Sequence, residues 1–185
     1  MIHEWRSYRL KPGAAGDYLA LLADEGLPLV TRHLPLTGYW LAETGALNTI
    51  HHLWSYAGWA EREAARAALA HEEEWVKGFI PRAFALVQAQ ENRFLRLDRS
   101  SATFDAALAA RRRVHPARRP GTPLFAADCA GLVTGAAPMD AVAVWTPASG
   151  DPQPMALLPR GADPVPAKPL PGAHVVLRPL AFSPL

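Results

Sequence analysis

The first half of the chain opens with a strand and a helix. Apolar and polar residues alternate from Ile2 to Leu10, which is the period of a strand with one buried face, and a Lys-Pro-Gly turn follows. From Tyr18 onwards, apolar residues recur at helical spacing. Gly26 and Pro28 are expected to end or kink this helix before Leu34. The pattern therefore predicts β-α at the start of the chain.

Two more strands, a helical region and a last strand follow. The aromatic-rich runs Thr37–Glu43 and Thr49–Tyr56 are typical of strands. An alanine-rich helix is expected over Trp59–Leu69 and further helix over Glu72–Phe79. Leu86–Leu97 closes the unit as a strand. The order β-α-β-β-α-β predicts an α+β fold, the ferredoxin-like antiparallel sheet with both helices on one face.

That sheet has one face without helices. Large side chains on this face, among which we expect Trp54 and Tyr56, would be costly to leave in water. A second sheet must therefore cover the face. It is supplied either by a partner subunit or by the rest of the chain.

The composition changes near residue 98. Residues 1–98 contain four prolines, twelve acidic and ten basic residues, whereas residues 99–185 contain fourteen prolines, five acidic and nine basic residues. We therefore divide the chain into a first domain, 1–98, and a Pro-rich second part, 99–185. Short strands and one helix at its start are expected in the second part.

The second part has features of a degenerate copy of the first. The run Ala141–Thr146 is similar to Ile50–Ser55. This similarity places Trp145 where the first half has Trp54. Seven prolines between Asp151 and Pro171 exclude a regular helix there, so a copy would have lost its second helix. An unrelated β-rich extension is the alternative. We favour a copy that completes a barrel within one chain over a homodimer.

Bulk composition excludes several functional classes. Half of the 185 residues are hydrophobic and the net charge is +2, which suits a packed core and predicts neither nucleic acid nor a membrane as a partner. The single cysteine, Cys129, excludes an intrachain disulfide and a cysteine-rich zinc site. The chain lacks an apolar membrane span and an apolar signal segment, so we expect a cytoplasmic protein.

Three segments, in this order, resemble the NIPSNAP family. They are Tyr8–Gly13, Gly38–Tyr56 and Gln90–Arg93, and Ala181–Leu185 is similar to the end of many members. The resemblance covers about residues 1–97. It implies a ferredoxin-like unit that pairs sheet to sheet, as in the dimeric α+β barrel superfamily. It implies little about activity, because members are uncharacterised or described as binding and scaffolding proteins, whereas the superfamily includes monooxygenases and haem enzymes.

Strand alternation selects a candidate ligand site. His52 shares one face of its strand with two aromatic residues, whereas His51 points to the other face. Adjacent histidines of this kind cannot chelate one ion, so we expect no metal and no cofactor. An imidazole beside aromatic and amide groups suits the wall of a small-molecule pocket. The candidate residues, expected to bind a small organic ligand inside the barrel, are Asn48, His52, Trp54, Tyr56, Gln90 and Asn92.

Three functions fit the sequence. The preferred one is a non-catalytic NIPSNAP-like protein that binds a small organic molecule. A cofactor-free monooxygenase-like enzyme would use His52 as a general base. In a structural or interaction module, the sheet face would serve only assembly. Glu4 and Arg6 are expected to form a solvated or interface ion pair. The sequence contains no GxSxG elbow, phosphate-binding loop or GxGxxG fingerprint.

Overall fold

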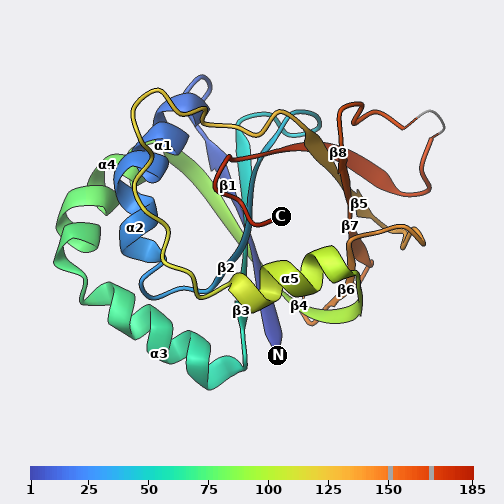
Figure 1. The fold of residues 1–185 in the computed structure, drawn as a ribbon, viewed down its shortest axis with the longest axis horizontal. Helices are drawn as coiled ribbons and strands as arrows, with labels where there is room; N and C mark the ends of the chain where they lie inside the picture. The colour runs from blue at the N-terminus through green and yellow to red at the C-terminus, as the bar shows by residue number, and fades with distance from the viewer. Residues whose placement is uncertain (150–151, 167–168) are drawn as a thin grey trace.

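The computed structural model describes residues 1–149, 152–166 and 169–185 (Figure 1). In this part of the chain the strands are β1 (Ile2–Leu10), β2 (Leu36–Ala42), β3 (Thr49–Tyr56), β4 (Val87–Ser100), β5 (Cys129–Thr134), β6 (Ala143–Pro147), β7 (Met155–Gly161) and β8 (Ala173–Pro179). The helical segments, where η marks a π-helical turn, are α1 (Ala15–Leu21), η1 (Leu22–Gly26), α2 (Leu27–Val30), α3 (Trp59–Ala70), η2 (Glu74–Phe79), α4 (Ile80–Phe84) and α5 (Ala102–Ala110). The predicted α+β class and the order β-α-β-β-α-β in the first half are confirmed.

All eight strands form one closed antiparallel barrel, in the order β1-β3-β2-β8-β5-β7-β6-β4. Strand β1 lies between β3 and β4, so that Arg6 is opposite both His52 and Asn92. The two halves of the chain meet where β2 pairs with β8 and where β4 pairs with β6. The second half therefore supplies the sheet that covers the first. The composition boundary at residue 98 falls inside β4.

The two halves have the same strand order. Across the first half it is β4-β1-β3-β2, and across the second it is β8-β5-β7-β6. Strand β6 thus takes the place of β2, and not of β3. The predicted equivalence of Trp145 with Trp54 is therefore wrong, because Trp145 lies in the barrel core and Trp54 in the core beneath the helices. The tryptophan of β2 that shares the core of Trp145 is Trp40.

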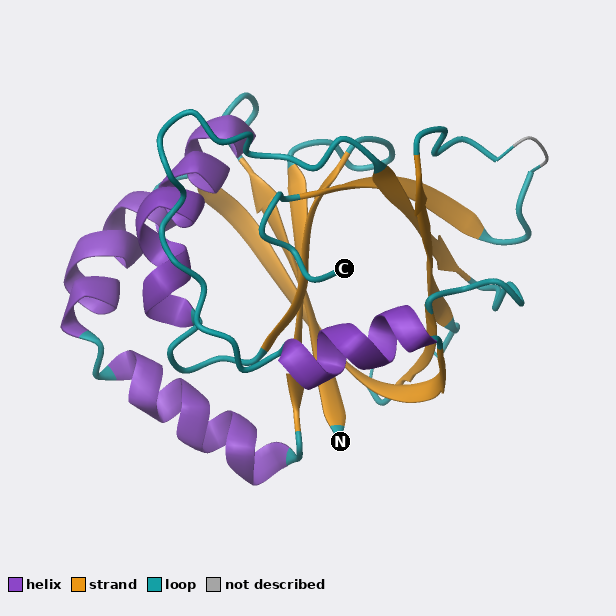
Figure 2. Cartoon of the chain, viewed as in Figure 1, coloured by secondary structure: helices purple, strands orange, loops and turns teal. Residues whose placement is uncertain are grey.

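Helices cover the barrel mainly on the side of the first half (Figure 2). The first helix continues past Gly26 through the π-helical turn η1 into α2 and ends at Val30, before Leu34 as predicted. Pro28 lies in the first turn of α2 and has no N–H to donate back into η1; the Ala23 carbonyl oxygen accepts from the Arg118 N–H at 2.8 Å instead. Gly26 is needed because a Cβ atom there would lie 2.4 Å from the Phe79 ring. None of the helices in the described residues is long and apolar enough to cross a membrane.

Both faces of the first sheet are buried. Trp54 and Tyr56 pack beneath the helices, so the expectation that they lie on the helix-free face is wrong. Trp5 and Trp40 occupy that face instead, and they pack with Trp145 inside the barrel. The indoles of Trp5 and Trp40 stack with their ring centroids 5.3 Å apart. Because large apolar side chains are costly to leave in water, these tryptophans require the second sheet.

One end of the barrel is closed by the helix α5. Ser101 caps this helix by accepting a hydrogen bond from the backbone N–H of Phe104 at 3.4 Å. The Phe104 ring then lies 5.7 Å from His3 and 5.5 Å from Trp145. Leu185 joins the same core. Because His3 is near the start of β1, α5 closes the end of the barrel at which β1 begins.

Replacing Gly38 by alanine is expected to destabilise the protein. Its Cβ atom would lie 2.0 Å from the Trp40 indole, and forcing such a ring to move in a packed core costs about 1–3 kcal/mol. Gly16→Ala is the matched control, because Gly16 is exposed in α1 with nothing within 4 Å. An alanine there should stabilise by up to about 1 kcal/mol. Urea unfolding of both variants checks this, and equal midpoints would contradict it.

Candidate functional site

A pocket of about 280 Å³ lies between the first sheet and the helices. It is outside the barrel interior, on the face that the helices cover. We call it the helix-side pocket. Strands β1 to β4 form its floor, and the π-helical turns η1 and η2 contribute to its roof; such turns are frequent at functional sites. Its lining consists of Arg6, Tyr8, Tyr18, Leu22, Val30, Leu34, Tyr39, His52, Trp54, Arg66, Leu69, Trp75, Ile80, Phe84 and Gln90.

His52 is the buried polar group at the centre of this pocket. Trp54 Nε1 donates a hydrogen bond to His52 Nδ1 at 2.6 Å. Because Nδ1 accepts, the ring proton of the neutral imidazole is on Nε2. Burial, with the charge of Arg6, lowers the pKa of His52 well below its usual value, so the neutral form persists. Within the described residues Nε2 has no hydrogen-bond partner.

Aromatic rings frame the imidazole. Tyr39 stacks on His52 with the centroids 4.9 Å apart and the planes 8° from parallel. Tyr8 meets it edge-on at 4.8 Å. Burial raises the pKa of Tyr8, Tyr18 and Tyr39, so these phenols stay protonated at neutral pH. The pocket therefore combines flat apolar walls with uncharged polar tips.

Arg6 supplies positive charge at the edge of the pocket. Its guanidinium donates to the Tyr8 hydroxyl at 3.1 Å and to Gln90 Oε1 at 3.3 Å. It also lies 5.3 Å from the centre of the Tyr8 ring. Arg66 of α3 lines the same pocket. An acceptor oxygen of a ligand would therefore meet both a cation and the His52 N–H group.

A buried carboxylate holds Arg6 in place. Glu4 is completely buried and accepts hydrogen bonds from Arg62 at 2.9 and 3.1 Å, from Arg6 at 3.2 Å and from Asn92 at 2.9 Å. Burial alone would raise the pKa of Glu4, but the hydrogen bond from Arg62 and the charges of Arg6, Arg62 and Arg66 outweigh it and lower the pKa. The expected pair of Glu4 and Arg6 is present. It is buried and not solvated, because α3 covers it.

The structure brings together only part of the predicted site. His52, Trp54 and Gln90 line the helix-side pocket. Asn92 lies beside them but binds Glu4, and the fully buried Tyr56 is part of the core beneath the helices. Asn48 is outside the pocket, because it forms the turn before β3 with φ 56° and accepts a hydrogen bond from the Gly13 N–H at 3.3 Å.

Sequence reasoning missed the residues that surround His52. Arg6 and Tyr8 share a face of β1 by simple alternation. Since β1 is adjacent to β3, their place beside His52 follows once the strand order is known. Tyr39 is opposite His52 in the β2–β3 register, and a sequence does not define a register. Tyr18 reaches the pocket from α1 only through tertiary packing.

The protonation of His52 limits its chemistry. A general base must offer an unprotonated nitrogen to the group that it deprotonates. Nδ1 is engaged by Trp54, and Nε2 holds the proton. His52 is therefore arranged to donate a hydrogen bond to a ligand, which favours binding over the proton abstraction that a monooxygenase-like mechanism would assign to it.

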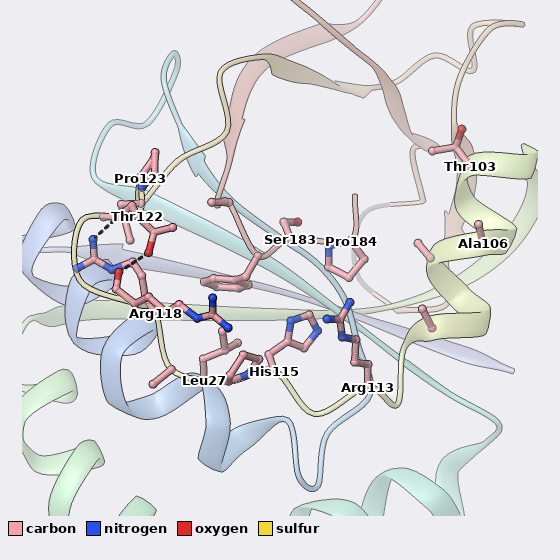
Figure 3. Close-up of a pocket in the computed structure, with 18 residues that line it drawn as sticks. Leu27, Thr103, Ala106, Arg113, His115, Arg118, Thr122, Pro123, Ser183 and Pro184 are labelled. Carbon is pink, nitrogen blue, oxygen red and sulfur yellow. Dashed lines mark hydrogen bonds between the residues drawn. The ribbon is translucent and has the colours of Figure 1, made fainter.

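A larger hollow of the described surface lies elsewhere. It is a groove of about 720 Å³ between α5, the connection after it and the C-terminal tail. Figure 3 shows Arg113 and His115 side by side, facing Ser183 and Pro184. Arg118 at its rim forms an ion pair with Asp24 at 2.8 Å. The groove is open, and no buried polar atom without a partner is found among its described lining residues. We therefore place the candidate site in the smaller helix-side pocket.

Fold and pocket together define the class: an antiparallel barrel in which one half carries a helical layer with an aromatic, histidine-containing pocket beneath it. The NIPSNAP family profile matches residues 3–102, more than half of the chain. The chain therefore belongs to the NIPSNAP family, as the resemblance in its first 97 residues indicated. Family membership does not by itself establish a specific activity.

Individual relatives match the first half. Human NipSnap homolog 3A is 38% identical over 93 residues, which are 50% of this chain and 37% of the human protein. Mouse NipSnap homolog 3B is 36% identical over 90 residues, 36% of its length. The chain thus spans about a third of the length of these relatives. Among solved structures, protein Atu4242 from Agrobacterium tumefaciens superposes with a TM-score of 0.53 at 36% identity, covering 55% of this chain and 98% of that chain.

Proposed function

We propose that residues 99–185 take the place of a partner subunit, so that one chain forms a pseudo-dimeric, ferredoxin-like α+β barrel. The shared strand order of the two halves supports this proposal. So does the extent of the family match, which ends at residue 102, and the near-complete coverage of the Agrobacterium protein by about half of this chain. The second half would then be a degenerate repeat in which loops replace both helices.

We further propose that the protein binds a small, flat organic molecule in the helix-side pocket. The observation that carries this proposal is His52 Nε2–H, a buried donor in an aromatic pocket with no partner among the described residues. An unmade hydrogen bond of a buried group is costly, and a ligand oxygen would remove that cost. The positive edge formed by Arg6 favours an anionic or strongly polar oxygen.

The ligand class follows from the size and the chemistry of the walls. A volume of about 280 Å³ admits a bicyclic aromatic molecule and no large cofactor. Stacked and edge-on rings favour a planar partner. We therefore expect a planar aromatic compound that bears a carboxylate, phenolate or carbonyl oxygen, and 2-naphthoate is a suitable probe.

His52→Asn is expected to weaken 2-naphthoate binding about tenfold, since it removes the Nε2 donor. The asparagine oxygen can still accept from Trp54 Nε1, so folding should remain cooperative. Asn48→Gly is the control, because Asn48 lies outside the pocket and its positive φ suits glycine. Isothermal titration calorimetry with all three proteins checks the result. Equal affinities for wild type and His52→Asn, or no binding to the wild type, would refute the site.

A further inference from the structure

A second cavity lies on the opposite face of the same sheet. It has a volume of about 420 Å³ and is lined by residues of seven barrel strands. Its lining runs along β1 from Trp5 past Ser7 to Arg9, towards the end of the barrel that α5 does not close. His51 lines this cavity and its neighbour His52 lines the helix-side pocket. The two adjacent histidines of β3 thus serve different cavities.

One wall of this barrel-end cavity is polar and preorganised. Ser7 is opposite His51 on β3 and Glu91 on β4. Trp5 Nε1 can only donate, so its contact of 3.3 Å makes His51 Nδ1 an acceptor, and the Ser7 hydroxyl at 2.8 Å donates to the same atom. Burial lowers the pKa of His51 to about 4. The imidazole is therefore neutral, with a proton on Nε2 to donate.

An unsatisfied hydroxyl lies in the same wall. Thr49 is opposite Arg9 in the β1–β3 register and lines the cavity. The residue is only 7% exposed, and within the described residues its Oγ1 has no hydrogen-bond partner. Buried hydroxyls are nearly always hydrogen-bonded. This orphan donor therefore indicates a polar occupant of the cavity.

One positive charge at the cavity has no negative partner among the described residues. Arg93 Nε donates to Glu91 Oε1 at 2.6 Å, and these two charges balance. Arg9 forms no ion pair within the described residues and lies at the rim. The opposite wall comes from the second half and, apart from Thr134, is apolar, with Leu132, Met155 and Val175. One wall thus suits a single negative charge and the other suits a hydrocarbon.

We propose that the open end of the barrel is a second ligand site, which binds a small amphipathic monoanion of the medium-chain carboxylate class. The carboxylate is held by Arg9 and the Thr49 hydroxyl, and the hydrocarbon lies along Leu132, Met155 and Val175. A dianion would exceed the one uncompensated charge. This site does not depend on the helix-side pocket, since the β-sheet separates the two.

Methionine methyl groups report on this site selectively. The chain has three methionines; Met155 is 2% exposed in the cavity wall, whereas Met1 and Met139 are 56% and 86% exposed. With ¹³C-methyl methionine, octanoate should shift the Met155 signal and leave the other two in place. 1-Octanol, which lacks the charge, should bind at least tenfold more weakly. An unmoved Met155 signal at millimolar octanoate, or equal binding of the alcohol, overturns the proposal.

Two variants test the polar contacts. Thr49→Val preserves the shape, and Arg9→Gln removes the charge from an exposed position; each should weaken octanoate binding about tenfold, with little change for 1-octanol. His52→Asn, on the other face of the sheet, is the control and should leave the octanoate affinity unchanged. Unaltered octanoate affinity in both cavity variants overturns the proposal. A loss of octanoate binding in His52→Asn does so too, because the probe would then occupy the helix-side pocket.

Discussion

Glu4→Gln is expected to lower the free energy of unfolding by about 3–5 kcal/mol, the usual cost of removing one partner from a buried ion pair. The carboxylate is completely buried and is the counter-charge of Arg6 and Arg62, with Arg66 at 4.0 Å. Glutamine preserves the volume but leaves these guanidinium groups without a negative charge. Urea unfolding at neutral pH measures the loss.

The control for this experiment uses the same arginine. Glu63 also pairs with Arg62, at 2.7 Å, but its side chain is 57% exposed. Exposed ion pairs contribute at most about 1 kcal/mol, so Glu63→Gln should have a small effect. If the two glutamine variants lose similar free energies of unfolding, burial of the Glu4 network contributes nothing to stability. Glu4→Gln should also weaken 2-naphthoate binding, because Arg6 would lose the contact that orients it.

The strands of the first half were predictable because alternation is a local signal. Their two faces were not distinguishable, since the helices bury one face and the second half buries the other. Seven of the eight residues of β3 are buried, and only His51 is partly exposed. Without a polar face, alternation separates two sets of residues but does not say which set faces the helices. Trp54 was therefore assigned to the wrong face.

The first helix ends at Val30, before Leu34 as predicted, but it does not end at the glycine. Gly26 and Pro28 are signals for the end of an isolated helix, but tertiary packing against Phe79 requires the glycine inside the helical run. In the second half, short strands resemble one another, so local similarity paired Ala141–Thr146 with the wrong strand. Strand order decides that question, and it depends on contacts between residues far apart in sequence.

In the candidate site too, local relations were predictable from the sequence and contacts between strands were not. The pair His52 and Trp54 was found because residues two apart on a strand share a face, and their hydrogen bond is local. Tyr39 and Arg6 reach His52 across neighbouring strands. A pocket built from cross-strand neighbours needs the register, which no single segment contains. The barrel-end cavity could not be predicted for the same reason, because its walls come from both halves of the chain.

Acidification is expected to unfold the protein between about pH 6.5 and pH 4. Burial, with the positive charges of the N-terminus and Arg111, lowers the pKa of His3 to about 4, burial lowers that of His51 to about 4, and that of His52 is well below its usual value. In the unfolded chain the pKa of each imidazole is near the usual histidine value of about 6.5. The unfolded state therefore binds protons first as the pH falls. Stability is complete above pH 6.5 and is lost below it.

The size of this effect approaches the whole stability of a small domain. Each buried histidine contributes a slope of up to about 1.4 kcal/mol per pH unit, so three of them can remove several kcal/mol over two units, against a typical total of about 5–15 kcal/mol. Urea unfolding from pH 7.5 to 4.5 measures the slope. His52→Asn should reduce this slope by up to about 1.4 kcal/mol per pH unit, the contribution of one proton. His71→Asn, at an exposed helix end, is the control and should leave the slope unchanged. A stability that is flat between pH 7 and 5 would show that these imidazoles take up protons without unfolding, and would contradict the neutral, donor form of His52 on which the ligand site rests.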